Sequence, residues 1–141
     1  MKHVIVSTLL LLITWSKAIA HFDADNPNAY GTIMVSTYGA IPDDGIDDTQ
    51  PIRNAINAAI ATNSPQVVLF EAGRYDLISA GTANFYIRIL NGNNIILRGV
   101  AVNNEPATKL VRFNNGVENA VLPFLFQIRF SKNITVENLI F

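Results

Sequence analysis

Two stretches of the same pattern decide the fold: NIILRG at residues 94–99 and NITVEN at residues 133–138. The second begins 39 positions after the first, and the same offset aligns the apolar residues of 85–90 with those of 124–129. A repeat of this length is typical of a solenoid, in which each unit buries its apolar face only against its neighbours. Chance similarity between two strand–turn–strand units is the alternative, and the Asn shared before each strand argues against it.

Short apolar runs separated by Asn and Gly fill the rest of this region, which is a pattern of β-strands and not of helices. The run at 110–113 lies between the two copies, so we expect the 39 positions to hold two turns of about 20 residues each. Strands are predicted at residues 33–35, 67–70, 75–78, 85–90, 95–100, 110–113, 124–130 and 134–141.

One amphipathic helix is predicted before most of these strands. Its apolar residues recur at helical spacing along one face; they are Ile52, Ala55, Ile56, Ala59 and Ile60. Asp48 or Thr49 is expected to cap the first turn by accepting hydrogen bonds from free backbone N–H groups. Pro51 fits that turn because its missing N–H costs nothing there, and residues 63–65 are expected to end the helix.

The segment around this helix resembles the N-terminal signature of the pectate lyase and polygalacturonase superfamily. The matching residues are YGA at 38–40, DG at 44–45, DDT at 47–49, Ile52, Ala55, Ile56, VVLF at 67–70, AG at 72–73 and Tyr75. NITVENL at 133–139 is similar to a strand of the same fold. Pro51 and Glu71 depart from the residues that are usual in the superfamily, which indicates a divergent member.

This resemblance implies a fold for residues 33–141. The expected fold is all-β: a right-handed single-stranded parallel β-helix of the pectin-lyase-like kind, with an N-terminal capping α-helix and truncated at the C-terminal end. The helix would cover the apolar interior and the unpaired strand edges at the first end of the stack.

The residues of the signature are interpreted as structural. Glycines permit turn geometries closed to other residues, and carboxylates before a helix satisfy free N–H groups at the positive end of its dipole. The residues assigned to the cap and turns are Gly39, Asp44, Gly45, Asp47, Asp48, Thr49, Gly73 and Tyr75. Calcium binding by the four aspartates of 43–48 is the alternative, but their spacing lacks the ligand pattern of a calcium loop. We therefore expect no metal and no cofactor, Ca²⁺ being implied only if the parent protein is a lyase.

Catalytic and substrate-binding residues stay unassigned. Polygalacturonases resemble one another in later motifs, namely aspartates on consecutive turns, Gly-His-Gly and Arg-x-Lys, and none of these is in the sequence. The two histidines, His3 and His21, precede the strand region. The absence of cysteine excludes thiol catalysis and cysteine-based zinc sites.

Several basic and aromatic side chains are candidates for contacts with a sugar ligand. The arginines that recur in the strand region are Arg88, Arg98, Arg112 and Arg129. An acidic polysaccharide would need such charges, although we favour the alternative of a solvated outer face. Tyr75, Phe85 and Tyr86 would stack on sugars, but such residues more often belong to the core. NIT at 133–135 matches a glycosylation acceptor, a short pattern that also occurs by chance.

Residues 1–20 have the features of a cleaved signal peptide: Lys2, an apolar run of about a dozen residues and an Ala-Ile-Ala cleavage pattern at 18–20. The run is too short to span a bilayer, so we expect a secreted, periplasmic or cell-surface protein with no membrane span after cleavage. Residues 21–32 are interpreted as a leader and 33–141 as the cap and first turns. The formal net charge of −1 gives no basic footprint for nucleic acid.

Two functions follow from this sequence. The first is that of an N-terminal fragment of an exported pectin- or uronan-type glycoside hydrolase or polysaccharide lyase, itself inactive, because the chain closes on the apolar run 134–141 without a polar cap. The second is a non-catalytic carbohydrate-binding β-helix, such as a surface protein, an adhesin or a phage-tail domain. The expected partner is an acidic polysaccharide, and the oligomeric state is not predicted.

Overall fold

The computed structural model describes residues 30–78, 85–114, 117–118 and 124–141. The predicted signal peptide and most of the predicted leader lie outside these residues. No helix in the described part is long and apolar enough to cross a membrane.

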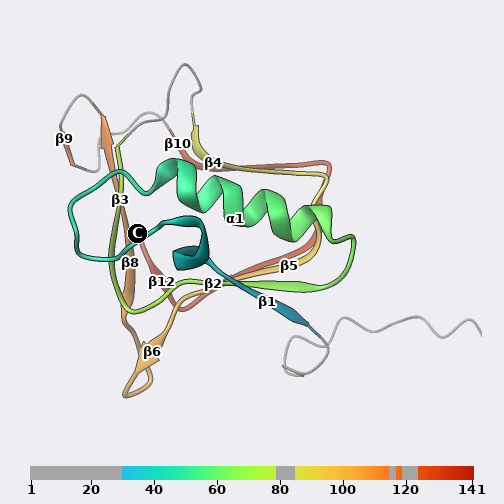
Figure 1. The fold of residues 1–141 in the computed structure, drawn as a ribbon, viewed down its shortest axis with the longest axis horizontal. Coiled ribbons are helices and arrows are strands. Elements are labelled where there is room, and N and C mark those ends of the chain that lie inside the picture. The colour runs from blue at the N-terminus through green and yellow to red at the C-terminus, as the bar shows by residue number, and fades with distance from the viewer. Residues whose placement is uncertain (1–29, 79–84, 115–116, 119–123) are drawn as a thin grey trace, which may run out of the picture.

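The described chain is mostly strand, with one α-helix (Figure 1). The helical elements are α1 (Thr49–Ala61) and the short 3₁₀ helix η2 (Val35–Tyr38). The longer strands are β1 (Gly31–Met34), β2 (Gln66–Leu69), β3 (Gly73–Leu77), β4 (Phe85–Leu90), β5 (Asn93–Arg98), β8 (Thr108–Asn114), β10 (Phe124–Arg129) and β11 (Lys132–Glu137). The two-residue strands are β6 (Ala101–Val102), β7 (Glu105–Pro106), β9 (Val117–Glu118) and β12 (Leu139–Ile140).

These strands form several short sheets. Three sheets are built on parallel pairs: β1-β2-β5-β11, β4-β10, and β3-β8-β12, with β9 pairing antiparallel to β8. Strands β6 and β7 form a separate antiparallel hairpin. The prediction of an all-β, single right-handed parallel β-helix is therefore wrong. The physical reason is that apolar runs favour strand pairing only locally. They do not specify how the strands are distributed among sheets, or how a helix packs against those sheets.

The 39-residue repeat seen in the sequence aligns residues that pair directly in the structure. Ile134 pairs with Ile95 along β11 and β5, and Phe124 pairs with Phe85 along β10 and β4. The prediction of two turns within those 39 positions is wrong, because each strand pairs directly with its copy. Strand β8 lies between the copies in sequence but pairs with β3 and β12 in another sheet.

Asparagines at the bends make this register possible. Asn91, Asn94 and Asn133 have φ angles of 58°, 55° and 53°, in the left-handed region that Asn tolerates better than most residues. The Asn133 side-chain amide donates a hydrogen bond to Oδ1 of Asn94 at 2.7 Å, so the two equivalent bends are also joined by their side chains. The shared Asn that identified the repeat therefore has a structural role in both copies.

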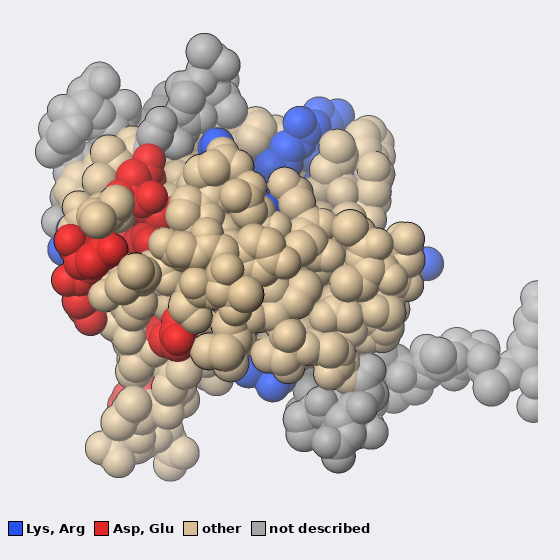
Figure 2. Space-filling view, in the orientation of Figure 1, with Lys and Arg blue, Asp and Glu red and all other residues tan. Residues whose placement is uncertain are grey.

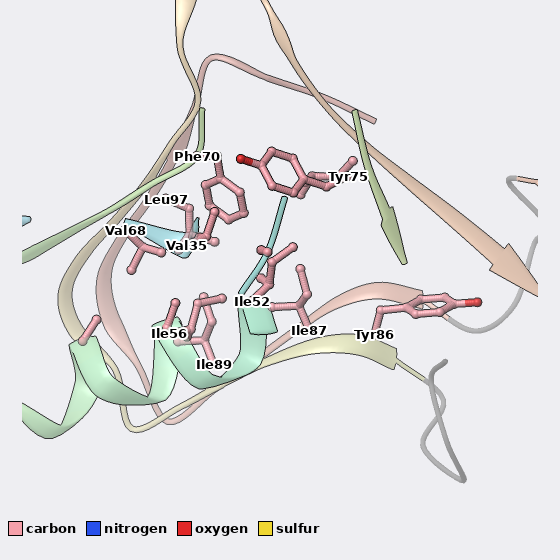
Figure 3. Close-up of a cluster of buried hydrophobic side chains, with 14 of the residues drawn as sticks. Val35, Ile52, Ile56, Val68, Phe70, Tyr75, Tyr86, Ile87, Ile89 and Leu97 are labelled. Atoms are coloured by element: carbon pink, nitrogen blue, oxygen red, sulfur yellow. The ribbon is translucent and has the colours of Figure 1, made fainter. Parts of the chain in front are cut away.

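The core lies between α1 and the strands (Figure 3). The predicted helix is confirmed, and its apolar face buries Ile52, Ala55, Ile56 and Ala59 completely, while Ile60 is partly buried. The strands, and Phe70 just after β2, contribute fully buried side chains to the same cluster; those of the strands include Val68, Tyr75, Leu77, Ile87, Ile89 and Leu97. Burial of this apolar surface is the main force that holds the helix on the strands.

Helix α1 also covers the free edge of β4. Arg53, on the helix, donates a hydrogen bond from Nε to the carbonyl of Tyr86 and one of 3.1 Å from Nη2 to the carbonyl of Phe85. Strand β4 pairs with β10, and no second described strand pairs with it. A charged donor at such an edge satisfies the backbone and blocks pairing with another strand.

We expect Arg53→Met to lower the free energy of unfolding by about 1–3 kcal/mol, because two half-buried carbonyls lose a charged donor. Urea denaturation followed by far-ultraviolet circular dichroism measures the change. Asn57→Ala, one turn further along the same helix at an exposed position, is the control and should stay within about 0.5 kcal/mol of the wild type. Equal unfolding midpoints for Arg53→Met and Asn57→Ala would show that the edge needs no donor.

Candidate functional site

The predicted cap and turn residues come together beside strand β3. The Asp48 side chain is only 2% exposed, and its two oxygens accept hydrogen bonds of 3.0 Å from the backbone N–H groups of Ile41 and Asp76. The Asp48 backbone N–H also donates to the Asp76 carbonyl at 2.8 Å. Asp48 therefore fastens the loop before α1 to the edge of β3.

Asp47, and not Asp48 or Thr49, supplies the carboxylate at the start of α1. Its Oδ1 accepts hydrogen bonds of 3.0 Å from the backbone N–H groups of Thr49 and Ile78. The side chain of Asp48 makes no capping hydrogen bond to the helix, so the predicted Asp48 or Thr49 cap is wrong. The reason is tertiary: the N–H groups of Ile41 and Asp76 lie closer to the Asp48 carboxylate than the helix N–H groups do.

The other aspartates of the loop bind nearby backbone as well. Asp44 accepts a hydrogen bond of 2.8 Å from the N–H of Ile46, and Asp43 accepts one of 3.0 Å from the N–H of Arg74. Among the residues that the structure describes, no three acidic or histidine side chains gather in an arrangement suited to a metal ion. Asp43 thus holds the loop against β3, and Asp44 orders the loop itself.

The three glycines that were assigned to turns have positive φ angles. Gly39 has φ 93° at the end of η2, Gly45 has φ 70°, and Gly73 has φ 124°. At Gly73 there is also no room for a side chain, because a Cβ atom would lie 2.4 Å from a carboxylate oxygen of Asp43. Gly39 lies in a turn and Gly45 in the loop before α1, whereas Gly73 is the first residue of β3.

Two of the aromatic residues considered for sugar stacking are buried. Tyr75 is 0% exposed and packs edge-on against Phe70 with ring centroids 5.7 Å apart. Its hydroxyl accepts a hydrogen bond of 3.0 Å from the Glu71 backbone N–H, and burial raises the pKa of that hydroxyl far above its ordinary value. Tyr86 is buried as well. Of the three aromatic residues, only Phe85 retains a partly exposed ring.

A groove between α1 and β4 brings together polar, basic and aromatic side chains that suit a ligand. It encloses about 330 Å³ and is lined by Gln50, Arg53, Asn57, Phe85, Arg88 and Leu90. Gln50, Arg53 and Asn57 follow one another along one side of α1, and the remaining lining residues belong to β4. Figure 2 shows Lys and Arg atoms above α1 where β4 runs, whereas Asp and Glu atoms gather around the loop before the helix.

Arg88 is the cation that this groove presents to solvent. It is exposed, and its guanidinium carbon lies 5.7 Å from the centre of the Phe85 ring. No described carboxylate forms an ion pair with it. Arg53 is held by the edge carbonyls of β4, and burial lowers the pKa of its guanidinium.

The other recurring arginines are placed differently. Arg98 forms an ion pair with Glu137 on the neighbouring strand, and Arg112 is half-buried. Arg129 is exposed over the Phe130 ring, with 5.1 Å between the guanidinium carbon and the ring centre, and it lies outside the groove lining. Arg129 therefore fits the expectation of a solvated outer face. Arg88 is also exposed, but it lines a groove to which the Phe85 ring contributes.

The sequence reading found Arg88 and Phe85 but missed Gln50, Arg53 and Asn57. Their signal was present as polar residues spaced three and four apart on the predicted helix, beside its apolar face. What the spacing does not reveal is that this side of the helix lies along β4, which is more than 30 residues away in sequence.

Comparison with known proteins adds no relative to this picture. No protein-family model matches the sequence, and no curated protein matches it either. The resemblance to the pectate lyase and polygalacturonase superfamily therefore stays a prediction from motifs. The function has to be argued from the groove itself.

The buried Asp48 carboxyl group predicts that the free energy of unfolding depends on pH. Burial, together with the nearby Asp44 and Asp76 carboxylates, raises its pKa from 3.8 to about 6, while hydrogen bonds from the Asp76 and Ile41 backbone oppose the rise. The folded state thus holds this proton more tightly than the unfolded state. The resulting stabilisation is complete below about pH 4 and is lost as the pH rises through 6.

We expect Asp48→Asn to remove this dependence, because the amide does not titrate. The free energy of unfolding of the variant, relative to wild type, should rise by about 1–3 kcal/mol between pH 4 and pH 7.5. Urea titrations at the two pH values measure it. Glu105→Gln, at an exposed position of β7, is the control and should show no such change. A parallel pH response in wild type and Asp48→Asn would contradict the assignment.

Proposed function

We propose that this is an exported protein that binds an acidic polysaccharide in the groove between α1 and β4. The observation that carries the proposal is Arg88: an exposed guanidinium over the Phe85 ring, with Gln50 and Asn57 in the same groove. Export is supported by the signal-like pattern of residues 1–20.

Each group in the groove suits one part of a uronic acid unit. A guanidinium presents N–H donors in a fixed plane that matches a carboxylate. The side-chain amides of Gln50 and Asn57 donate and accept hydrogen bonds, as sugar hydroxyl groups require. The partly exposed ring of Phe85 offers an apolar surface for the C–H face of the sugar. The open position of this groove, between a helix and a strand, suits a polymer better than a closed small-molecule pocket does.

Binding is favoured over bond cleavage by the lining of this groove. Glycoside hydrolysis uses two carboxylates on opposite sides of the scissile bond, about 5–9.5 Å apart. The described lining of the groove contains no Asp or Glu, and the carboxylates of the loop before α1 accept backbone hydrogen bonds. A hydrolase or lyase activity is the second candidate, with only the motif resemblance in its favour.

The test is the affinity for a uronic acid oligosaccharide of defined length, measured by isothermal titration calorimetry against a neutral oligosaccharide of equal length. We expect Arg88→Gln to weaken binding of the acidic ligand about tenfold, which is about 1.4 kcal/mol, within the range for a hydrogen bond to a charged group. Added salt should weaken wild-type binding in the same direction.

Arg129→Gln is the matched control, since Arg129 is also an exposed arginine over a phenylalanine but lies outside the groove lining. It should bind the acidic ligand as the wild type does. Equal loss in both variants would mean that general charge attraction, and not the groove, holds the ligand.

A further inference from the structure

The motif Asn133-Ile134-Thr135 has the form of an N-glycosylation acceptor and takes no part in the groove. It lies at the start of β11, directly after the chain bends between β10 and β11. A glycan is bulky and soluble, so its acceptor has to lie at the surface. The position of the Asn133 side chain therefore decides whether the motif can serve.

The Asn133 side chain is open to solvent. It is exposed, whereas Asn94, its equivalent in β5, is half-buried. Strand β11 is the last strand of its sheet; β5 pairs with one of its edges, and no described strand pairs with the other. A group attached to Asn133 therefore meets solvent and not a neighbouring strand.

The hydrogen bond that Asn133 makes is compatible with a glycan. Its Nδ2 donates to Oδ1 of Asn94 at 2.7 Å. An amide nitrogen carries two hydrogens, and a glycan replaces one of them. The other hydrogen remains available for Asn94, so the contact between the two bends does not compete with attachment.

Thr135 supplies the hydroxyl group that the acceptor needs. It pairs with Ile96 of β5, which is fully buried. Packing against an isoleucine does not require a hydroxyl group at position 135. The equivalent stretch at 94–96 is Asn-Ile-Ile and is therefore no acceptor.

The free edge of β11 is the surface that a glycan at Asn133 would cover. An open strand edge is a site for pairing with another chain, and Val136 on this strand is 38% exposed. A bulky, soluble group at the first turn of the strand obstructs a second chain that lies along this edge.

We propose that Asn133 carries an N-linked glycan, which shields the free edge of β11 from pairing with a second chain. The inference rests on the proposed export of the protein, because acceptors of this kind are used in secreted proteins. It does not depend on a ligand in the groove.

Attachment is tested by translating the whole chain in the presence of endoplasmic-reticulum microsomes. Gel electrophoresis before and after N-glycosidase digestion shows whether a glycan is present. We expect one glycosidase-sensitive shift for the wild type and for Thr135→Ser, which keeps the hydroxyl group. Thr135→Val, which keeps Asn133 but lacks the hydroxyl group, should show no shift, and neither should Asn133→Gln.

Protease added to the intact microsomes separates the ways in which the proposal can fail. A chain that is protected from the protease but shows no shift refutes the glycan and leaves the proposed export standing. A chain that is not protected refutes export and the glycan together. A shift that persists in Asn133→Gln refutes the assignment to Asn133.

Shielding is tested on the wild-type chain secreted by one eukaryotic host grown with or without tunicamycin, which blocks N-glycosylation. The two products then have the same sequence and differ only in the glycan. In sedimentation velocity we expect the product without the glycan to self-associate at about tenfold lower concentration. Equal self-association of the two products would refute the shielding.

Discussion

Backbone groups on the edges of short parallel sheets have to find partners, and this constraint governs most polar side chains of the described structure. Strand β4 has its free edge along α1, where Arg53 donates to two of its carbonyls. Strand β3 has its edge along the loop before α1, where Asp48 accepts the Asp76 N–H and donates its own N–H to the Asp76 carbonyl. An edge left open would be a site for pairing with another chain. One helix and the loop before it therefore cover two edges of different sheets.

The same constraint explains how the carboxylates of the acidic loop are used. Burying a carboxylate is unfavourable unless hydrogen bonds compensate, and Asp48 obtains two from backbone N–H groups. The compensation is incomplete, and its pKa stays raised to about 6. The carboxyl group is thus held at some energetic cost in a position where it orders the loop and the start of α1. Those elements in turn fix Arg53, and through it the side of the helix that lines the groove.

Local periodicity was sufficient to predict α1 and to identify the repeat, but not to predict how the copies pair. Ile52, Ile56 and their neighbours have helical spacing, and the helix occupies the predicted residues. The 39-residue offset aligned Ile134 with Ile95, but two turns were expected within it, whereas the two residues pair directly. Features that depend on distant contacts were not predictable in this way. The sequence does not show that β8 leaves the repeat to pair with β3, or that the Asp48 carboxylate prefers the N–H of a strand to the N–H of a helix. The groove depends on the same kind of contact.

Residues that pair across the 39-residue repeat show which side chains serve packing and which serve the surface. Some positions that hold the paired strands together repeat their residue type: Ile95 and Ile134, Asn94 and Asn133. A position that faces a neighbouring side chain repeats with opposite charge, as Arg98 and Glu137 do. Arg88 and its partner Gln127 follow neither rule, because an exposed cation is paired with an amide and forms no described ion pair. Packing does not require this difference.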